Sequence, residues 1–380
     1  MKKTIFITGA TGNVGAKLVA QILQNDLNAH LVLLIRSQST VEGEQRVMEA
    51  VQMVSPEIDY SQARRRIEVV CGDVSMDKLG FSDWEYSKFA EEVTHIIHSA
   101  ATTQFNLPLE CAHQVNVVGT KNVMEFAKMA QHAGNLNKVA HISTAYVCGN
   151  LEGTIYENNT AKGDGFSNSY EHTKWVAEQL VRDMMGQLPV MIFRPSIVVG
   201  DSRTGRTIKF NVLYTPLYYM WRGYVKALPC APDAPVDVVS ADFVAESITH
   251  IFLTSEQAVG KTFHIVAGSG KAASIEEIAE HAINYFNSKG TGAHFEPVRF
   301  IPPMMQTTSP MNQAGEMKRA LSLVKMFEPY MYQKRTFDCS NTMEALNGSL
   351  ITLLKLTDYL DVILDYSIAT DWGRRMRKAA

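Results

Sequence analysis

Chain length, composition and charge already exclude several classes of protein. The sequence has 380 residues, of which 46% are hydrophobic and 20% charged, and its formal net charge is −3. This balance is typical of an ordinary globular protein of one large or two smaller domains, and it disfavours nucleic acid as a partner.

Compact apolar runs alternate with helical patterns along the first 200 residues. A strand is expected at Thr4 to Thr8, a glycine turn follows it, and a helix is expected from Val14 to Gln24. Further strands are expected at residues 30–36, 66–73, 94–101, 138–144 and 189–195. Because these strands are continuously apolar and alternate with helices, the pattern predicts an α/β fold with a doubly wound parallel Rossmann sheet.

The character of the chain changes after Gly200. Residues 213–235 are aromatic and punctuated by proline, without a clear strand, whereas residues 236–268 resemble a return to the sheet. A helix is expected near 274–286, a loop at 295–316 and mostly helices over the last fifty residues. We predict a nucleotide-binding domain of residues 1–210 with 236–268 returning to it. Residues 211–235 and 269–380 form the predicted, mostly helical substrate domain.

Cysteine usage and the N-terminus indicate the compartment. The five cysteines form no CxxC pair and no histidine cluster accompanies them, so neither a metal site nor a disulfide framework is expected. No stretch reaches the roughly 20 apolar residues of a membrane span, and the first apolar run is too short for a signal peptide. We therefore expect a cytoplasmic protein.

The segment "TGATGNVG" places glycines directly after a strand and at the start of a helix. Glycine at positions 9, 12 and 15 allows a tight turn and a close approach of the backbone to a pyrophosphate, which the free N–H groups of the helix would bind. Thr11, Asn13 and Val14 belong to the same predicted dinucleotide site as Gly9, Gly12 and Gly15. The alternative is a tight turn without a ligand.

The end of the second strand indicates which dinucleotide is bound. Sites for NAD usually carry an acidic residue there, but this chain has Arg36, followed by Ser37. A guanidinium suits a 2′-phosphate, so the sequence favours NADPH over NADH. Asp73, next to Val74, is placed to accept from the adenine amino group. The small residues Ser99, Ala100 and Ala101 would let the cofactor lie against the sheet edge.

Seven motifs follow one another in an order known from one family. They are "TGATGNVG", "GDV", "HSAA", "NVVGTKNV", "ISTAYVCG", "YEHTK" and "FRPSIVVGDSRTG". The chain resembles an extended short-chain dehydrogenase/reductase over residues 4 to 270. It is most similar to the thioester reductase and fatty acyl-CoA reductase branch, and the likeness weakens after residue 290.

The "YEHTK" segment carries the predicted proton donor. Tyr170 and Lys174 lie four residues apart, on one face of a helix, and a nearby ammonium is expected to lower the pKa of the phenol. The resemblance implies that Lys174 also holds the nicotinamide ribose and that Pro195 lies in the cofactor site. It further implies Thr144 as the catalytic hydroxyl and Asn116 as an organising residue. Ser143 is the second choice, and strand alternation predicts that only one of the two hydroxyls faces the cofactor.

The resemblance implies NADPH-dependent reduction of an acyl thioester, carried by coenzyme A or a carrier protein, to an aldehyde and possibly an alcohol. Thr144 and Tyr170 would stabilise and then protonate the carbonyl oxygen. This route needs no covalent cysteine, so we expect Cys148 to be a packed small residue.

Three further segments have open interpretations. Arg203, Arg206 and Lys209 would meet the phosphates of coenzyme A or an acidic carrier protein, or form a solvated basic loop. Residues 213–224 would wall an acyl groove or pack in a core. The amphipathic stretch 350–368 and the basic end "GRRMRK" would touch a membrane surface or remain solvated.

Two rival functions keep the same fold. One is an NAD(P)-dependent epimerase, dehydratase or oxidoreductase acting on another carbonyl or hydroxyl substrate, which Arg36 and the aromatic stretch disfavour. The other is a non-catalytic NADP-sensing protein, which has no need of Tyr170 and Lys174.

Overall fold

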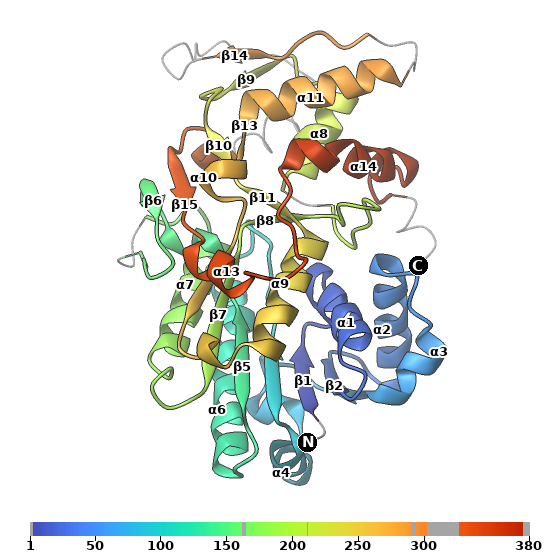
Figure 1. Cartoon of the computed structure of the whole chain (residues 1–380), viewed down its shortest axis with the longest axis vertical. Coiled ribbons are helices and arrows are strands. Elements are labelled where there is room, and N and C mark those ends of the chain that lie inside the picture. The colour runs from blue at the N-terminus through green and yellow to red at the C-terminus, as the bar shows by residue number, and fades with distance from the viewer. Residues whose placement is uncertain (1–2, 162–164, 211, 290–293, 302–326, 375–380) are drawn as a thin grey trace.

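The centre of the molecule is a parallel sheet. The computed structural model describes residues 3–161, 165–210, 212–289, 294–301 and 327–374. The sheet strands are β1 (Thr4–Thr8), β2 (His30–Ile35), β3 (Ile67–Cys71), β4 (His95–His98), β5 (Lys138–Ile142), β7 (Val190–Pro195) and β12 (Thr262–Ile265). Their order is β12-β7-β5-β4-β1-β2-β3 (Figure 1), which confirms the doubly wound sheet. The order reverses between β1 and β4, where open sheets of this kind bind ligands at the carboxyl ends of the strands.

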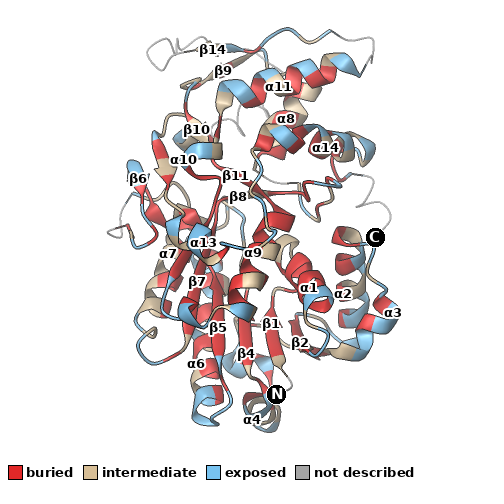
Figure 2. Cartoon of the chain, in the orientation of Figure 1, coloured by how far each residue is buried: buried red, intermediate tan, exposed pale blue. Residues whose placement is uncertain are grey.

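Helices cover both faces of the sheet. One face carries α1 (Asn13–Asn25), α2 (Thr40–Val54) and α9 (Ala241–Thr254), and the other carries α4 (Asp83–Glu92), α6 (Gly119–His132) and α7 (Ser169–Arg182). Successive strand residues feed the two cores, since Ile5 and Ile7 belong to one and Phe6 to the other. Figure 2 accordingly shows the sheet strands as buried along most of their length.

A third core lies beyond the carboxyl ends of the strands and forms what we call the second lobe. Its elements are β8 (Ile197–Val199), α8 (Tyr214–Trp221), β9 (Ala227–Pro229), β10 (Pro235–Val236), β11 (Val238–Ser240), β13 (Ala273–Ser274), α11 (Ile275–Ser288), β14 (Arg299–Ile301) and α14 (Leu356–Ala369). Helices α8, α11 and α14 pack together there, in the upper part of Figure 1. Strands β8 and β11 pack in this core, although the prediction assigned their residues to the nucleotide-binding domain, and the domain division stays a prediction.

Short elements connect these layers, and several strands of the second lobe were not expected, β9 and β14 among them. The connecting elements are α3 (Tyr60–Ala63), α5 (Leu109–His113), β6 (Gly153–Ile155), α10 (Gly268–Lys271), β15 (Arg335–Phe337) and α13 (Ser340–Ala345). Strands β9 and β14 lie in segments where the sequence predicted none, and they pair in parallel. Each has only three residues, too few for a recognisable alternation, and its partner is distant in sequence. Residues 302–316 of the predicted loop lie outside the described residues.

The end of the chain packs against the second lobe. The apolar side of α14, with Leu360, Ile363 and Leu364, is buried in the third core. The amphipathic stretch therefore uses its apolar side within the fold, which disfavours the suggested membrane contact. Residues 375–378 of the basic end lie outside the described residues. In the part of the chain that the structure describes, no helix combines the length and the apolar character needed to cross a bilayer.

Candidate active site

A continuous cavity of about 310 Å³ joins the carboxyl end of the sheet to the second lobe. Its lining includes many of the predicted site residues: Gly12, Asn13, Val14, Gly15, Ser99, Ala101, Thr144, Tyr170, Lys174 and Pro195. The other predicted residues lie outside this lining: Gly9, Thr11, Arg36, Asp73, Val74, Ala100 and Asn116. The glycine-rich segment and the predicted catalytic residues Thr144, Tyr170 and Lys174 therefore face the same cavity.

The glycine loop, residues 9–15, is shaped by close approaches of the backbone. Gly9 has a φ of +76°, and a Cβ there would lie 2.6 Å from the backbone nitrogen of Ala100. A Cβ on Gly15 would lie 2.1 Å from the carbonyl oxygen of Gly9. Side chains are therefore excluded at both positions, and the start of α1 stays open toward the cavity, as a dinucleotide cradle requires.

A second loop, residues 200–209, holds the glycine loop from the other side. The side-chain oxygen of Asn13 accepts hydrogen bonds from the Thr207 hydroxyl at 3.0 Å and from the backbone N–H of Ile208 at 3.2 Å. Deeper in the fold, Lys17 of α1 forms a buried ion pair of 2.8 Å with Asp201. These contacts link the glycine loop and α1 to the 200–209 loop, which leads into the second lobe.

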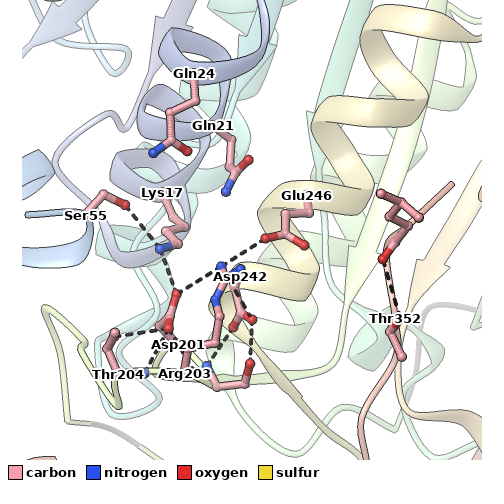
Figure 3. Close-up of polar contacts among 12 residues, drawn as sticks. Lys17, Gln21, Gln24, Ser55, Asp201, Arg203, Thr204, Asp242, Glu246 and Thr352 are labelled. Atoms are coloured by element: carbon pink, nitrogen blue, oxygen red, sulfur yellow. Dashed lines mark hydrogen bonds and ion pairs between the residues drawn. The ribbon is translucent and has the colours of Figure 1, made fainter. Parts of the chain in front are cut away.

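Figure 3 shows that this ion pair belongs to a larger network. Lys17 also donates to Ser55 at 3.1 Å, at the end of α2. Arg203 lies 3.6 Å from Asp201 and 3.0 Å from Glu246 of α9. The network therefore joins the 200–209 loop to three helices on one face of the sheet.

The network bears on the open interpretation of the basic loop. Arg203 is engaged by carboxylates, and Arg206 donates to the carbonyl oxygen of Met53 at 3.3 Å. Of the three predicted phosphate-binding cations, Lys209 alone lines the cavity in the described structure. Spacing in the sequence could not distinguish them, because their partners come from distant helices.

Arg36 lies at the outer edge of the sheet. Its side chain is 77% exposed and its guanidinium is 3.9 Å from the Asp73 carboxylate. Asp73 accepts from the backbone N–H of Ser75 at 2.8 Å. The Ser37 hydroxyl lies 3.4 Å from the Cys71 sulfur. The guanidinium is thus accessible to an anionic group beyond the end of β2.

Tyr170 and Lys174 project from α7 into the cavity. Burial raises the pKa of Tyr170 to about 12, although its hydrogen bond with the Thr144 hydroxyl acts in the opposite direction. Lys174 donates to the carbonyl oxygen of Ile142 at 2.8 Å. Burial lowers the pKa of Lys174 to about 8, and the charge of Glu178 opposes part of that shift.

The expected effect of the ammonium on the phenol is therefore wrong for this state of the protein. Desolvation of Tyr170 dominates, and Lys174 is directed to a backbone carbonyl rather than to the phenol. A raised pKa keeps the phenol protonated at neutral pH, as a proton donor must be.

The two adjacent hydroxyls have different partners. The Thr144 hydroxyl donates to the carbonyl oxygen of Pro195 at 3.3 Å and acts on the pKa of Tyr170, whereas the Ser143 hydroxyl donates to the buried carboxylate of Glu178 at 2.6 Å. Glu178 in turn pairs with Arg194, which is fully buried. This geometry favours Thr144 over Ser143 as the hydroxyl near the reacting group.

Asn116 ties together three segments behind the site. Its amide donates to the Thr173 hydroxyl of α7 at 2.9 Å and to the Thr102 carbonyl at 3.2 Å. Its oxygen accepts from the Thr102 backbone N–H at 2.8 Å. Asn116 therefore positions α7 and the loop after β4, which accords with an organising role.

Cys148 is fully buried, and the Arg335 guanidinium donates to its sulfur at 3.2 Å. Burial raises the pKa of the thiol, and Arg335 acts in the opposite direction. A protonated, inaccessible thiol agrees with the expectation of a packed residue.

The far part of the cavity is apolar. Leu213, Leu217 and Met220 line it from α8 and the residue before it, at the spacing of one helix face. Ile278 and Ala279 line it from α11. One face of the stretch 213–224 therefore borders the cavity, while Tyr214 packs in the third core; the role as the wall of an acyl groove stays a prediction.

Some lining residues were missed by sequence reasoning. Phe105, Glu171, Phe327, Tyr330 and Met331 all border the cavity near Tyr170. Glu171 lies within the "YEHTK" motif, which could have identified it. The other four residues belong to no recognisable motif. Glu178 is marked by its spacing, four residues after Lys174 on the same helix face.

Comparisons with known proteins agree with the resemblance. The model of the family described as "Male sterility protein" matches residues 7–248. Over 271 residues the chain is 30% identical to a linear gramicidin synthase of Brevibacillus parabrevis, covering 68% of this chain and 5% of that protein. Over 247 residues it is 30% identical to the fatty acyl-CoA reductase wat of Drosophila melanogaster, covering 56% of this chain and 46% of that one.

Solved structures of similar fold include the terminal R domain from the myxalamid PKS-NRPS biosynthetic pathway. Its TM-score is 0.82 at 26% identity, and the match covers 97% of this chain and 91% of that one. The chain spans less than half the length of the two curated relatives named above.

Proposed function

Because the chain belongs to the Male sterility protein family, within the extended short-chain dehydrogenases/reductases, we propose that it is an NADPH-dependent reductase of acyl thioesters. The observation that carries the proposal is the cavity. The glycine loop, Tyr170 and Lys174 line one part of it, and its far part is lined by apolar side chains, as the binding of an acyl chain requires. A fatty acyl-CoA reductase and an R domain among its relatives support the choice of substrate. The thioester is carried by coenzyme A or by a carrier protein.

The glycine loop fits a dinucleotide. Its backbone packs against the end of β4 at Gly9 and against its own first residues at Gly15, so neither position can carry a side chain that would fill the space of a pyrophosphate. Residues 9–15 and Ser99 to Ala101 would hold the dinucleotide, Arg36 its 2′-phosphate, Asp73 and Val74 its adenine, and Lys174 and Pro195 its nicotinamide end. When bound, NADPH supplies a hydride to the carbonyl carbon.

The chain's own residues handle the negative charge that develops on the carbonyl oxygen. The hydroxyls of Thr144 and Tyr170 donate hydrogen bonds to this oxygen, and Tyr170 then transfers its proton. Asn116 holds α7 in place through Thr173. The resulting hemithioacetal releases its thiol and leaves an aldehyde, and a second reduction of that aldehyde would give an alcohol.

The apolar far end argues against the rival epimerase chemistry. A sugar diphosphate needs polar partners along its length, whereas Leu217, Met220 and Ile278 offer none. A purely sensing role would not explain why Tyr170 and Thr144 share the substrate side of the cavity.

The test is loss of NADPH absorbance with a panel of acyl-CoA and acyl-pantetheine thioesters and the matching aldehydes. We expect thioester-dependent turnover that Tyr170→Phe lowers by about 100-fold or more, because the proton donor is removed. Tyr156→Phe is the matched control, since Tyr156 is 55% exposed. No turnover of any thioester by protein that binds NADPH, or a Tyr170→Phe variant as active as wild type, would contradict the proposal. Turnover of aldehydes would assign an alcohol product.

A further inference from the structure

The first turn of α7, which carries Tyr170, gathers two segments that are distant in sequence. From the loop after β4, the carbonyl oxygen of Leu107 accepts a hydrogen bond from the Ser169 hydroxyl at 2.9 Å. From the C-terminal part of the chain, the Tyr330 hydroxyl donates to the carboxylate of Glu171. Asn168, the N-cap of α7, donates to the same hydroxyl at 2.7 Å.

Glu171 is suited to hold Tyr330 in place. It is 1% exposed, and its other oxygen accepts from the Ser167 backbone N–H at 3.0 Å. Burial raises the pKa of Glu171, which the hydrogen bond from Tyr330 partly opposes. Because a buried carboxyl group without partners is costly, the carboxyl group favours the docked position of Tyr330.

These contacts bring together a group of aromatic rings next to Tyr170. Phe105 stacks on Tyr170 with ring centroids 5.8 Å apart. Phe327 and Tyr330 lie 6.3 and 6.2 Å from Phe105. We call Phe105, Phe327 and Tyr330 the aromatic collar, and all three line the cavity.

Contacts on the C-terminal side of Tyr330 fix the segment from residue 327 to 337. The carbonyl oxygen of Met331 accepts from the backbone N–H of Ala231 at 3.0 Å. Strand β15 pairs with β6, and the Arg335 guanidinium lies 5.2 Å from the centre of the Tyr146 ring. The position of Tyr330 is thus set from both lobes.

We infer that Tyr330, docked on Glu171 and Asn168, is a specificity-determining residue that restricts the space beside Tyr170 to acyl thioesters unbranched at the carbon next to the carbonyl. The inference rests on the proposed reduction of thioesters. Because Tyr330 lines the same cavity as Tyr170, a branch beside the carbonyl would meet its ring, whereas a straight chain would extend past the collar toward the apolar far end.

The test compares kcat/KM for straight-chain and 2-methyl-branched acyl-CoA substrates of equal carbon number. Tyr330→Ala is expected to lower the straight-to-branched ratio by about ten-fold, the order expected when a pocket gains room for a methyl group. Lys334→Ala, in the same segment and 72% exposed at its side chain, is the control and should leave the ratio unchanged. If Tyr330 only supported the fold, Tyr330→Ala would leave the straight-to-branched ratio of kcat/KM unchanged.

Glu171 is tested in the same assay. Glu171→Gln keeps an oxygen acceptor and should retain the wild-type ratio, whereas Glu171→Leu removes it and should lower the ratio toward that of Tyr330→Ala. A wild-type ratio in Tyr330→Ala would overturn the inference, and a wild-type ratio in Glu171→Leu would overturn the anchoring role. If Tyr330→Ala no longer binds NADPH, Tyr330→Leu is judged by the same criterion. Wild-type protein inactive on all thioesters would contradict the proposed function itself.

Discussion

At the residue scale, burial controls the chemistry of the proposed proton donors. Tyr170 and Lys174 lie one turn apart, and desolvation disfavours the charged form of each, so the pKa of the phenol is raised and that of the ammonium is lowered. A protonated phenol suits reduction, in which the enzyme gives up a proton, and Lys174 still carries its charge at neutral pH. The cost is a buried ammonium in the folded protein at neutral pH.

Stability should therefore depend on pH through Lys174. Its pKa is about 8 in the folded state against an ordinary value of 10.5, so between these values the unfolded state binds more protons. The free energy of unfolding of the wild type, relative to Lys174→Met, should rise by about 2 kcal/mol from pH 7 to pH 9.5. Urea unfolding of both proteins at the two pH values measures this. A difference that stays constant with pH would refute the prediction.

Arg36 is the residue on which we propose that the choice between NADPH and NADH depends. Its guanidinium is exposed at the end of β2 and has only a distant carboxylate, that of Asp73, as ion-pair partner among the described residues. Arg36→Ala should reduce the preference for NADPH over NADH by about ten-fold or more, since charge-assisted contacts to a phosphate are lost.

Dissociation constants of both cofactors, from quenching of intrinsic fluorescence, provide the measurement for Arg36→Ala. Arg64→Ala is the control, because Arg64 is also an exposed arginine paired with a carboxylate. An unchanged preference in Arg36→Ala would show that another group selects the cofactor.

At the element scale, the Lys17–Asp201 pair determines how α1 sits on its neighbours. Both side chains are almost fully buried. The Lys17 ammonium also donates to the Val54 carbonyl and the Ser55 hydroxyl, and the Asp201 carboxylate also accepts from the backbone N–H groups of residues 203 and 204. A buried pair with satisfied partners locks geometry more than it adds stability. The glycine loop at the start of α1 is thereby held against the 200–209 loop.

Asp201→Asn should destabilise the protein by about 3 kcal/mol or more, because the Lys17 ammonium stays buried without a counter-charge. The double variant Lys17→Met/Asp201→Asn should recover part of that loss. Urea unfolding measures all three proteins, and Glu246→Gln, whose partner Arg203 is 61% exposed at its side chain, serves as the mild control. A loss for Asp201→Asn no larger than for Glu246→Gln would contradict a locking role.

At the scale of the whole molecule, the site is built across two cores. The sheet supplies the glycine loop and α7 supplies Tyr170, while α8 and α11 of the second lobe supply the apolar far end. The proposed proton donor is thus separated in space from the proposed site for the acyl chain. Changes in the second lobe should alter substrate length without altering proton transfer.

Ala279→Phe tests that separation. Ala279 borders the apolar far end from α11, so a ring there should lower kcat/KM for long-chain acyl-CoA by about ten-fold and leave short chains nearly unchanged. Glu280→Phe places the same ring on the exposed side of α11 and is the control. Equal losses for short and long chains would show that the far end does not hold the chain.

Sequence alone determined the features that depend on neighbouring residues. The strands of the sheet, the glycine turn after Thr8 and the placement of Tyr170 and Lys174 on one helix follow from short-range rules of period and spacing. For the same reason the strands were found with nearly the observed bounds.

Only the tertiary structure decided which distant groups meet. Arg203 pairs with Glu246, Ser143 with Glu178 and Tyr330 with Glu171, and the two members of each pair are too far apart in the sequence for spacing rules to join them. The pKa of Tyr170 likewise depends on how much of the chain covers it rather than on the lysine one turn away. Long-range packing determines which charges are buried and which lobe closes the cavity, and local sequence patterns do not encode that packing.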